Sequence, residues 1–93
     1  MENAIAIEVN KLEEGGKLGE VETLLSNYLS NNPLDTEAML LRAQVYYKMQ
    51  QWGNALNDLN HLLMLEPENT AAQNYKTMVL NIISFWNKDN YNP

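Results

Sequence analysis

The sequence repeats itself every 34 residues, and this period limits the architectures open to it. Pro33 and Pro67 stand 34 residues apart, and each closes an apolar, helix-like segment. Shifting the chain by the same distance pairs side chains of similar chemistry. The pairs are Leu12–Tyr46, Leu18–Trp52, Gly19–Gly53, Val21–Ala55, Leu25–Leu59, Leu29–Leu63, Val45–Val79, Tyr46–Leu80, Met49–Ile83 and Trp52–Trp86. So many similar pairs predict an internal repeat, divided into residues 2–35, residues 36–69 and a partial unit, 70–93.

Within each unit, the apolar residues follow the period of an α-helix. In residues 36–51 they recur every three or four positions, as one buried helix face requires; they are Met39, Ala43, Tyr46 and Tyr47. In residues 52–66 the corresponding set is Ala55, Leu56, Leu59, Leu62, Leu63 and Met64. No segment alternates between apolar and polar residues, so no strand is predicted. We expect one all-α domain, residues 1–93, with helices at about 3–14, 19–31, 36–50, 53–65 and 70–87 and a tail at 88–93.

The segments between these helices contain turn and capping residues. Residues 50–53 form a connection short enough to force the helices on either side into an antiparallel hairpin. The matching turn in the first unit contains Gly15 and Gly16, and glycine adopts positive φ at little steric cost. Asp35 and Asn69 are suited to cap the helices that follow them, while the two prolines stop the preceding helices.

The unit from Thr36 to Asn69 resembles a tetratricopeptide repeat, a 34-residue helix–turn–helix with small residues at two fixed positions. The matching residues are Ala43, Tyr46, Ala55, Leu59 and Pro67, at the eighth, eleventh, twentieth, twenty-fourth and thirty-second positions. In this family the two small residues let the helices of a hairpin approach closely. Arg42 departs from the leucine that is usual at the seventh position.

The other two units match the family pattern less closely. In the first unit Val9 and Val21 replace the small residues, although Gly16 and Pro33 fit. The third unit has only its first helix. The resemblance therefore implies a helical-hairpin solenoid of about five antiparallel helices and two and a half repeats.

This resemblance implies a protein–protein interaction module, an adaptor or scaffold, that binds a peptide or helix on its concave face. That face is lined mainly by the first helix of each unit. The family pattern selects Asn3, Asn10, Glu13, Leu40, Gln44, Tyr47, Lys48, Asn74, Met78 and Asn81. Asparagine and glutamine amides both donate and accept hydrogen bonds, which suits an extended peptide backbone. The alternative interpretation is an ordinary solvated helix face, because asparagine is abundant throughout the chain.

The last predicted helix is apolar on almost every side from Met78 to Trp86. Val79, Ile83 and Trp86 occupy positions that the second unit would cover with its second helix, which the third unit lacks. Three covers are open: the tail folding back through its last residues, a second copy of the chain, or a different protein. A second copy would make the chain a self-associating structural module, a homodimer, and this is the alternative function.

Charge and composition exclude several classes of partner. The net charge is −6, which argues against nucleic-acid binding, because that affinity depends mainly on Lys and Arg. Residues 2–35 carry seven acids and two bases, so the first unit either steers a basic partner or is a charged face that favours solubility. No apolar run is long enough to cross a membrane and no signal peptide is visible. We therefore expect a cytoplasmic chain with no nucleic-acid or membrane partner.

Catalytic and metal-binding patterns are weak. The chain has no cysteine, and its one histidine, His61, falls on a second helix, where a partly exposed position is expected. The carboxylate pairs at residues 13–14 and 66–68 lie at helix ends, which favours solvated termini. We expect no enzyme activity, no metal and no cofactor.

Overall fold

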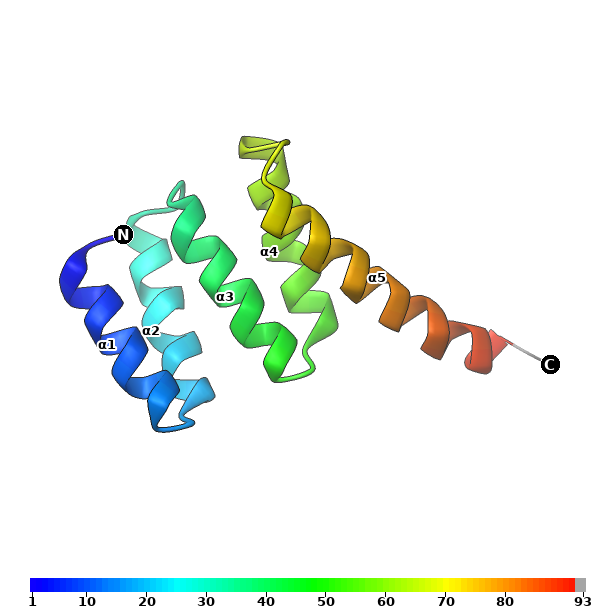
Figure 1. Cartoon of the computed structure of the whole chain (residues 1–93), viewed down its shortest axis with the longest axis horizontal. Helices are drawn as coiled ribbons and strands as arrows, with labels where there is room; N and C mark the ends of the chain where they lie inside the picture. The colour runs from blue at the N-terminus through cyan, green and yellow to red at the C-terminus, as the bar shows by residue number, and fades with distance from the viewer. Residues whose placement is uncertain (92–93) are drawn as a thin grey trace.

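The computed structural model describes the backbone of residues 1–91 and the side chains of residues 1–86, and all regular structure within these residues is helical. The helices are α1 (Asn3–Glu14), α2 (Leu18–Asn31), α3 (Thr36–Lys48), α4 (Trp52–Leu65) and α5 (Thr70–Tyr91). Short turns join α1 to α2 and α3 to α4 as two hairpins, and α5 packs on the second hairpin (Figure 1). The prediction of an all-α chain with five helices is confirmed.

Two helix ends differ from the sequence-based prediction. Helix α3 ends at Lys48 rather than near residue 50, because Gln50 adopts a positive φ of 59° that cannot continue a right-handed helix. Helix α5 continues to Tyr91, so residues 88–91 extend the helix and do not turn back over it. The prediction of a separate tail at 88–93 is therefore wrong for these four residues, and residues 92–93 lie outside the described part of the chain.

The turns that close the two hairpins have the same backbone geometry, 34 residues apart. Gly16 has a φ of 71°, and Gln50 at the equivalent position has a φ of 59°. Each turn also contains a backbone hydrogen bond between residues five positions apart. Such a bond is typical of helix C-termini at which one residue takes the left-handed conformation. These bonds run from the N–H of Lys17 to the carbonyl of Leu12 and from the N–H of Gln51 to the carbonyl of Tyr46, both at 2.9 Å. Gln50 therefore adopts the left-handed backbone conformation despite its side chain, whereas Gly16 adopts it at little steric cost.

The helix starts after the two prolines also match. The Asp35 side chain accepts a hydrogen bond from the Ala38 N–H at 3.0 Å and so caps α3. The Asn69 side chain accepts from the Ala72 N–H at the same distance and caps α5. Both predicted N-caps are confirmed, and each satisfies a backbone donor that the first turn of a helix leaves free.

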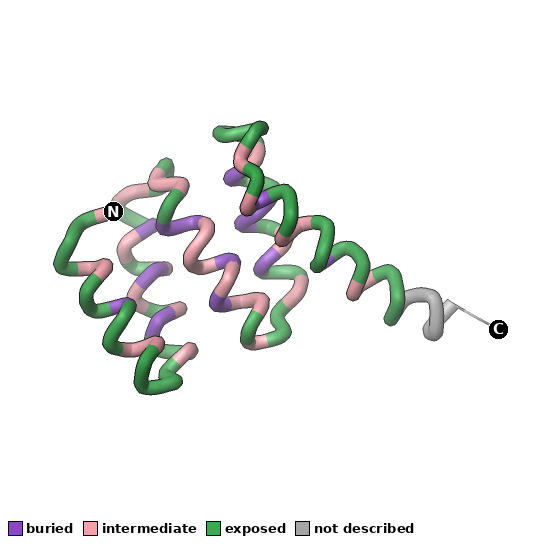
Figure 2. The backbone as a smooth tube through the Cα atoms, viewed as in Figure 1, coloured by how far each residue is buried: buried purple, intermediate pink, exposed green. Residues whose placement is uncertain are grey.

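The core lies between successive helices, as the buried segments in Figure 2 show. Its buried apolar residues are Val9, Val21, Leu25, Leu29, Ala38, Met39, Ala43, Val45, Ala55, Leu59, Leu62, Ala72 and Val79. Val9 and Val21 are as deeply buried in the first hairpin as Ala43 and Ala55 are in the second. Met64 is 81% exposed, so its predicted place on the buried face of the fourth helix is wrong. Met64 is two positions after Leu62 and five after Leu59, which places it about 200° and 140° around α4 from them, on the side away from the core.

The helices stand in two rows. Figure 1 shows α1, α3 and α5 nearer the viewer and α2 and α4 behind them, and α3 also contacts α5 directly. The final turns of α5 extend beyond α4 at the far end of a molecule that measures 51 × 30 × 20 Å. Within the described residues, no helix combines the length and the apolar character that a membrane crossing requires.

Candidate functional site

The residues predicted for partner binding come from the front row, α1, α3 and α5. On α3, Leu40, Gln44 and Tyr47 are spaced by four and then three positions, so they share one helix face. On α5, Asn74, Met78 and Asn81 repeat that spacing. The three α3 residues are half-buried, whereas the three α5 residues are exposed. Each helix therefore presents its predicted residues as one stripe.

An ion pair joins the predicted residues of α1 and α3. The Lys48 ammonium lies 4.0 Å from the Glu13 carboxylate, and the Lys48 side chain is 53% exposed. An ion pair at this distance and exposure contributes little to stability, but it places opposite charges side by side on the front row. Asn3 and Asn10 are exposed on the same helix as Glu13 and lie seven positions apart, about two turns.

Tyr47 is held between two aromatic rings. Its ring centroid lies 5.3 Å from that of Trp52 and 5.5 Å from that of Tyr75, with edge-on geometry in both cases. Edge-to-face pairs of this kind stabilise beyond the area that they bury. The two contacts tie α3 to the start of α4 and to α5, and they fix the orientation of the Tyr47 ring.

The predicted self-association residues divide between core and surface. Val79 is fully buried, so it is not part of any exposed surface and its assignment to a self-interface is wrong. The reason is that α5 packs this face on α4, within the chain itself. Ile83 is half-buried against the core, whereas Trp86 is 58% exposed. The exposed apolar surface at this end, here called the α5 end patch, consists of Phe85 and Trp86. Leu80 is also exposed, but it lies on another side of α5.

A buried ion pair between α3 and α4 was not predicted. Arg42 donates from Nε to Asp58 Oδ2 at 2.8 Å and from Nη2 to Asp58 Oδ1 at 2.6 Å. The Asp58 side chain is only 8% exposed and that of Arg42 is 23% exposed. Hydrogen bonds to Asp58 raise the pKa of Arg42 above its ordinary value, so the guanidinium stays charged.

The same arginine also reaches α2. Arg42 Nη1 donates to Ser26 Oγ at 3.1 Å, and the Ser26 hydroxyl donates to Glu22. Tyr46 donates to the same Glu22 carboxylate at 3.1 Å, and its ring centroid lies 5.8 Å from Arg42 Cζ. Burial raises the pKa of Tyr46, which keeps its hydroxyl protonated. The Arg42 network therefore links three helices through one charged side chain.

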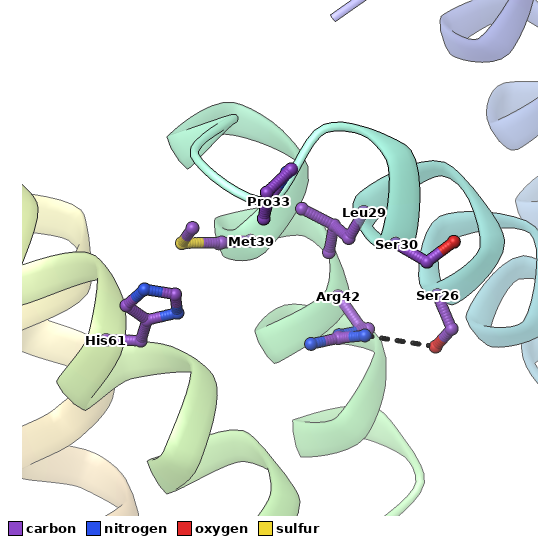
Figure 3. Close-up of a pocket in the computed structure, with 7 residues that line it drawn as sticks. All are labelled: Ser26, Leu29, Ser30, Pro33, Met39, Arg42 and His61. Carbon is purple, nitrogen blue, oxygen red and sulfur yellow. Dashed lines mark hydrogen bonds between the residues drawn. The ribbon is translucent and has the colours of Figure 1, made fainter.

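A pocket of about 290 Å³ opens beside this network, between α2, α3 and α4. Figure 3 shows His61 facing across it towards Arg42 and Ser26, with the apolar side chains of Leu29, Pro33 and Met39 gathered at one end. Arg42 is engaged by Asp58, and His61 is exposed as expected from the sequence. The described residues include no cluster of three His, Cys, Asp or Glu side chains that could hold a metal ion.

The connection between the two hairpins is polar. The Tyr28 hydroxyl donates to Asp35 at 2.7 Å, and the α-amino group of Met1 lies 3.3 Å from the same carboxylate. Burial acts to raise the pKa of Asp35, but the hydrogen bonds from Ala38, Tyr28 and the amino group outweigh it and hold the pKa below its ordinary value. Asp35 therefore caps α3 as an ionised carboxylate, which also suits the helix dipole.

One feature of the sequence indicated the Arg42 network: Arg42 is charged, whereas the tetratricopeptide pattern has leucine at that position. Asp58 carried none, because its partner lies 16 positions away and only the packing of α3 on α4 brings them together. Comparison of the chain with protein-family models, with curated proteins and with solved structures returned no match.

Proposed function

We propose that this chain is an interaction module of the tetratricopeptide-repeat type, an adaptor or scaffold that binds an extended peptide or a helix on the front row. The observation that carries the proposal is the 34-residue recurrence of local geometry. The left-handed turn residues Gly16 and Gln50 and the caps Asp35 and Asn69 keep this period, as the resemblance requires. Repeats that stack in this way create extended binding surfaces.

The chemistry of the front row supports peptide binding. Asn10, Gln44 and Asn74 offer one amide from each of the three helices, and each amide can pair with a peptide N–H or C=O. Met78 is 42% exposed and adds a flexible apolar contact. Tyr47 is already fixed by Trp52 and Tyr75, so its exposed part loses little freedom when a ligand docks.

The test is a double substitution on this face. A binding peptide is first selected from a random display library, and its contact surface is mapped by amide chemical shifts. Q44A combined with N74A is expected to weaken its binding about tenfold, because each lost hydrogen bond contributes about 0.5–1.5 kcal/mol. The matched control is N57A combined with N60A, two exposed residues of α4, which should leave the affinity unchanged. Equal affinities for both double variants would contradict the proposal.

A second candidate function is self-association through the α5 end patch. The Phe85 side chain is 64% exposed and that of Trp86 58%, and their rings form an edge-on pair with centroids 6.1 Å apart. Neighbouring exposed apolar side chains of this size are typical of protein interfaces. The patch lies on α5, but none of its residues is among those predicted for partner binding.

Sedimentation velocity tests this candidate. A dimer of the 10.7 kDa chain is expected at micromolar concentration, and F85S combined with W86S should return it to the monomer mass. Both side chains are exposed, so the substitutions should leave the fold intact. Met64→Ser removes another exposed apolar side chain, on α4, and should leave the dimer in place. A wild-type chain that stays monomeric at all concentrations removes this candidate.

A further inference from the structure

The outer side of the first hairpin carries a groove that the proposed function does not use. Two pockets of about 350 Å³ each lie between α1 and α2, and they share Leu24 and Asn27. One reaches towards the turn, and the other towards the open end of the hairpin, where Asn31 and Asn32 lie. The pockets together form what we call the α1/α2 groove. Their lining on α1 runs from Ile5 to Leu12, about 12 Å of helix.

The α1/α2 groove is apolar in its floor and acidic at its edges. Ile5, Leu12 and Leu24 are half-buried and line it from both helices. Glu8 and Glu20, one from each helix, are exposed and line the pocket nearer the turn. Glu8 and Leu12 are four positions apart, as are Glu20 and Leu24, so each carboxylate stands one turn from an apolar residue. The groove therefore offers apolar contact along its length and negative charge on both sides.

The carboxylates of the groove have little compensation within the chain. Glu20 lies 3.9 Å from Lys17, but both side chains are more than 60% exposed, so this pair is weak. No ion pair found among the described side chains involves Glu8. The whole unit, residues 2–35, carries seven acids against two bases. Its field attracts cations and repels anions.

We propose that the α1/α2 groove binds a cationic amphipathic helix. Apolar residues at three- and four-residue spacing would occupy the floor of the groove, and flanking Lys or Arg side chains would reach Glu8 and Glu20. An amphipathic helix with this spacing is the usual occupant of an apolar groove between two helices. Opposite charges across the contact favour both the rate of encounter and the choice of partner.

Charge also decides against two other occupants. A second copy of this chain carries a net charge of −6, and its own first unit holds most of that charge, so like charges would face each other. An anionic membrane surface is repelled for the same reason. The groove is lined by α1, α2 and the flanking residues Glu2 and Asn32, and no residue of α3 or α5 lines it. It can therefore be tested independently of the binding residues on those two helices.

The probe is a synthetic helix of about 15 residues with leucine on one face and lysine elsewhere, a length at which an isolated helix begins to form. Its binding is measured by fluorescence anisotropy at about 50 mM salt, where screening is modest. Amide chemical shifts then locate the contact. We expect the shifts to fall on α1 and α2, and a scrambled peptide of equal composition should bind at least about fivefold more weakly.

Asn27→Lys provides the decisive variant, because Asn27 belongs to both pockets and is exposed on α2. The new ammonium should weaken binding of the leucine–lysine helix about tenfold. Asn57→Lys makes the same change in net charge on exposed α4 and should weaken binding less than about twofold. Equal losses in the two variants, equal binding of the scrambled peptide, or shifts on α3 and α5 would each overturn the proposal. Circular dichroism of both variants verifies that the helices remain folded.

Discussion

Replacing Arg42 by alanine is expected to lower the free energy of unfolding by about 3 kcal/mol. The substitution leaves Asp58, whose side chain is 8% exposed, as a buried carboxylate without its two charge-assisted hydrogen bonds. It also removes the hydrogen bond that Ser26 Oγ accepts from the Arg42 guanidinium. The loss should appear in equilibrium urea denaturation as a lower midpoint with an unchanged slope.

Two further variants separate the buried charge from the packing around it. Arg42→Leu combined with Asp58→Leu removes both charges and should return stability to within about 1 kcal/mol of the wild type. Lys17→Ala removes a cation from the exposed pair with Glu20 and should change stability by less than about 0.5 kcal/mol. A loss in the double variant as large as that of Arg42→Ala would show that the network stabilises the fold in a way that apolar packing cannot replace.

Replacing Leu59 by alanine is expected to cost about 3 kcal/mol, by loss of buried apolar surface and by the cavity that remains. Leu59 is fully buried in α4, the helix that packs against both α3 and α5. The structure around such a site relaxes only in part, because the helices on each side of α4 are held by their own contacts. Urea denaturation measures the loss directly.

Leu65→Ala is the matched control for Leu59→Ala, since it is the same substitution in the same helix. Leu65 is 41% exposed, so it loses less apolar burial and leaves no enclosed cavity. Its cost should stay below about 1 kcal/mol. Equal losses of stability for the two substitutions would contradict the full burial of Leu59 and the partial exposure of Leu65.

The helices and their ends were predictable because they depend on short stretches of sequence. Asp35 and Asn69 cap the helices that begin one residue later, and their type alone indicates it. Two helix ends were exceptions. Helix α5 continues past residue 87 to Tyr91. At the end of α3, a glutamine gives no sign that its backbone turns to positive φ. The error at the end of α3 follows from that residue.

For the candidate binding residues, the sequence predicted which ones share a helix face, but it did not predict which residues they contact. The spacing of Leu40, Gln44 and Tyr47 places them on one face of α3 whatever the helix packs against. The ring contacts of Tyr47 with Trp52 and Tyr75 depend on how α4 and α5 are placed. The wrong prediction for Val79 has the same cause. The repeat shows that this residue is apolar, but it does not show whether α4 or a partner covers it.

The order of residues specifies the 34-residue period, the five helices and the two capping residues that follow the prolines. The helices and the caps depend on interactions within about four positions, and the period is a recurrence in the sequence itself. Three other features depend on how the helices pack. Arg42 pairs with Asp58, and Val79 is buried while Phe85 and Trp86 are exposed. The acidic edges of the first hairpin flank an apolar groove. Those outcomes depend on the distances between helices, which side-chain packing fixes and which no local pattern encodes.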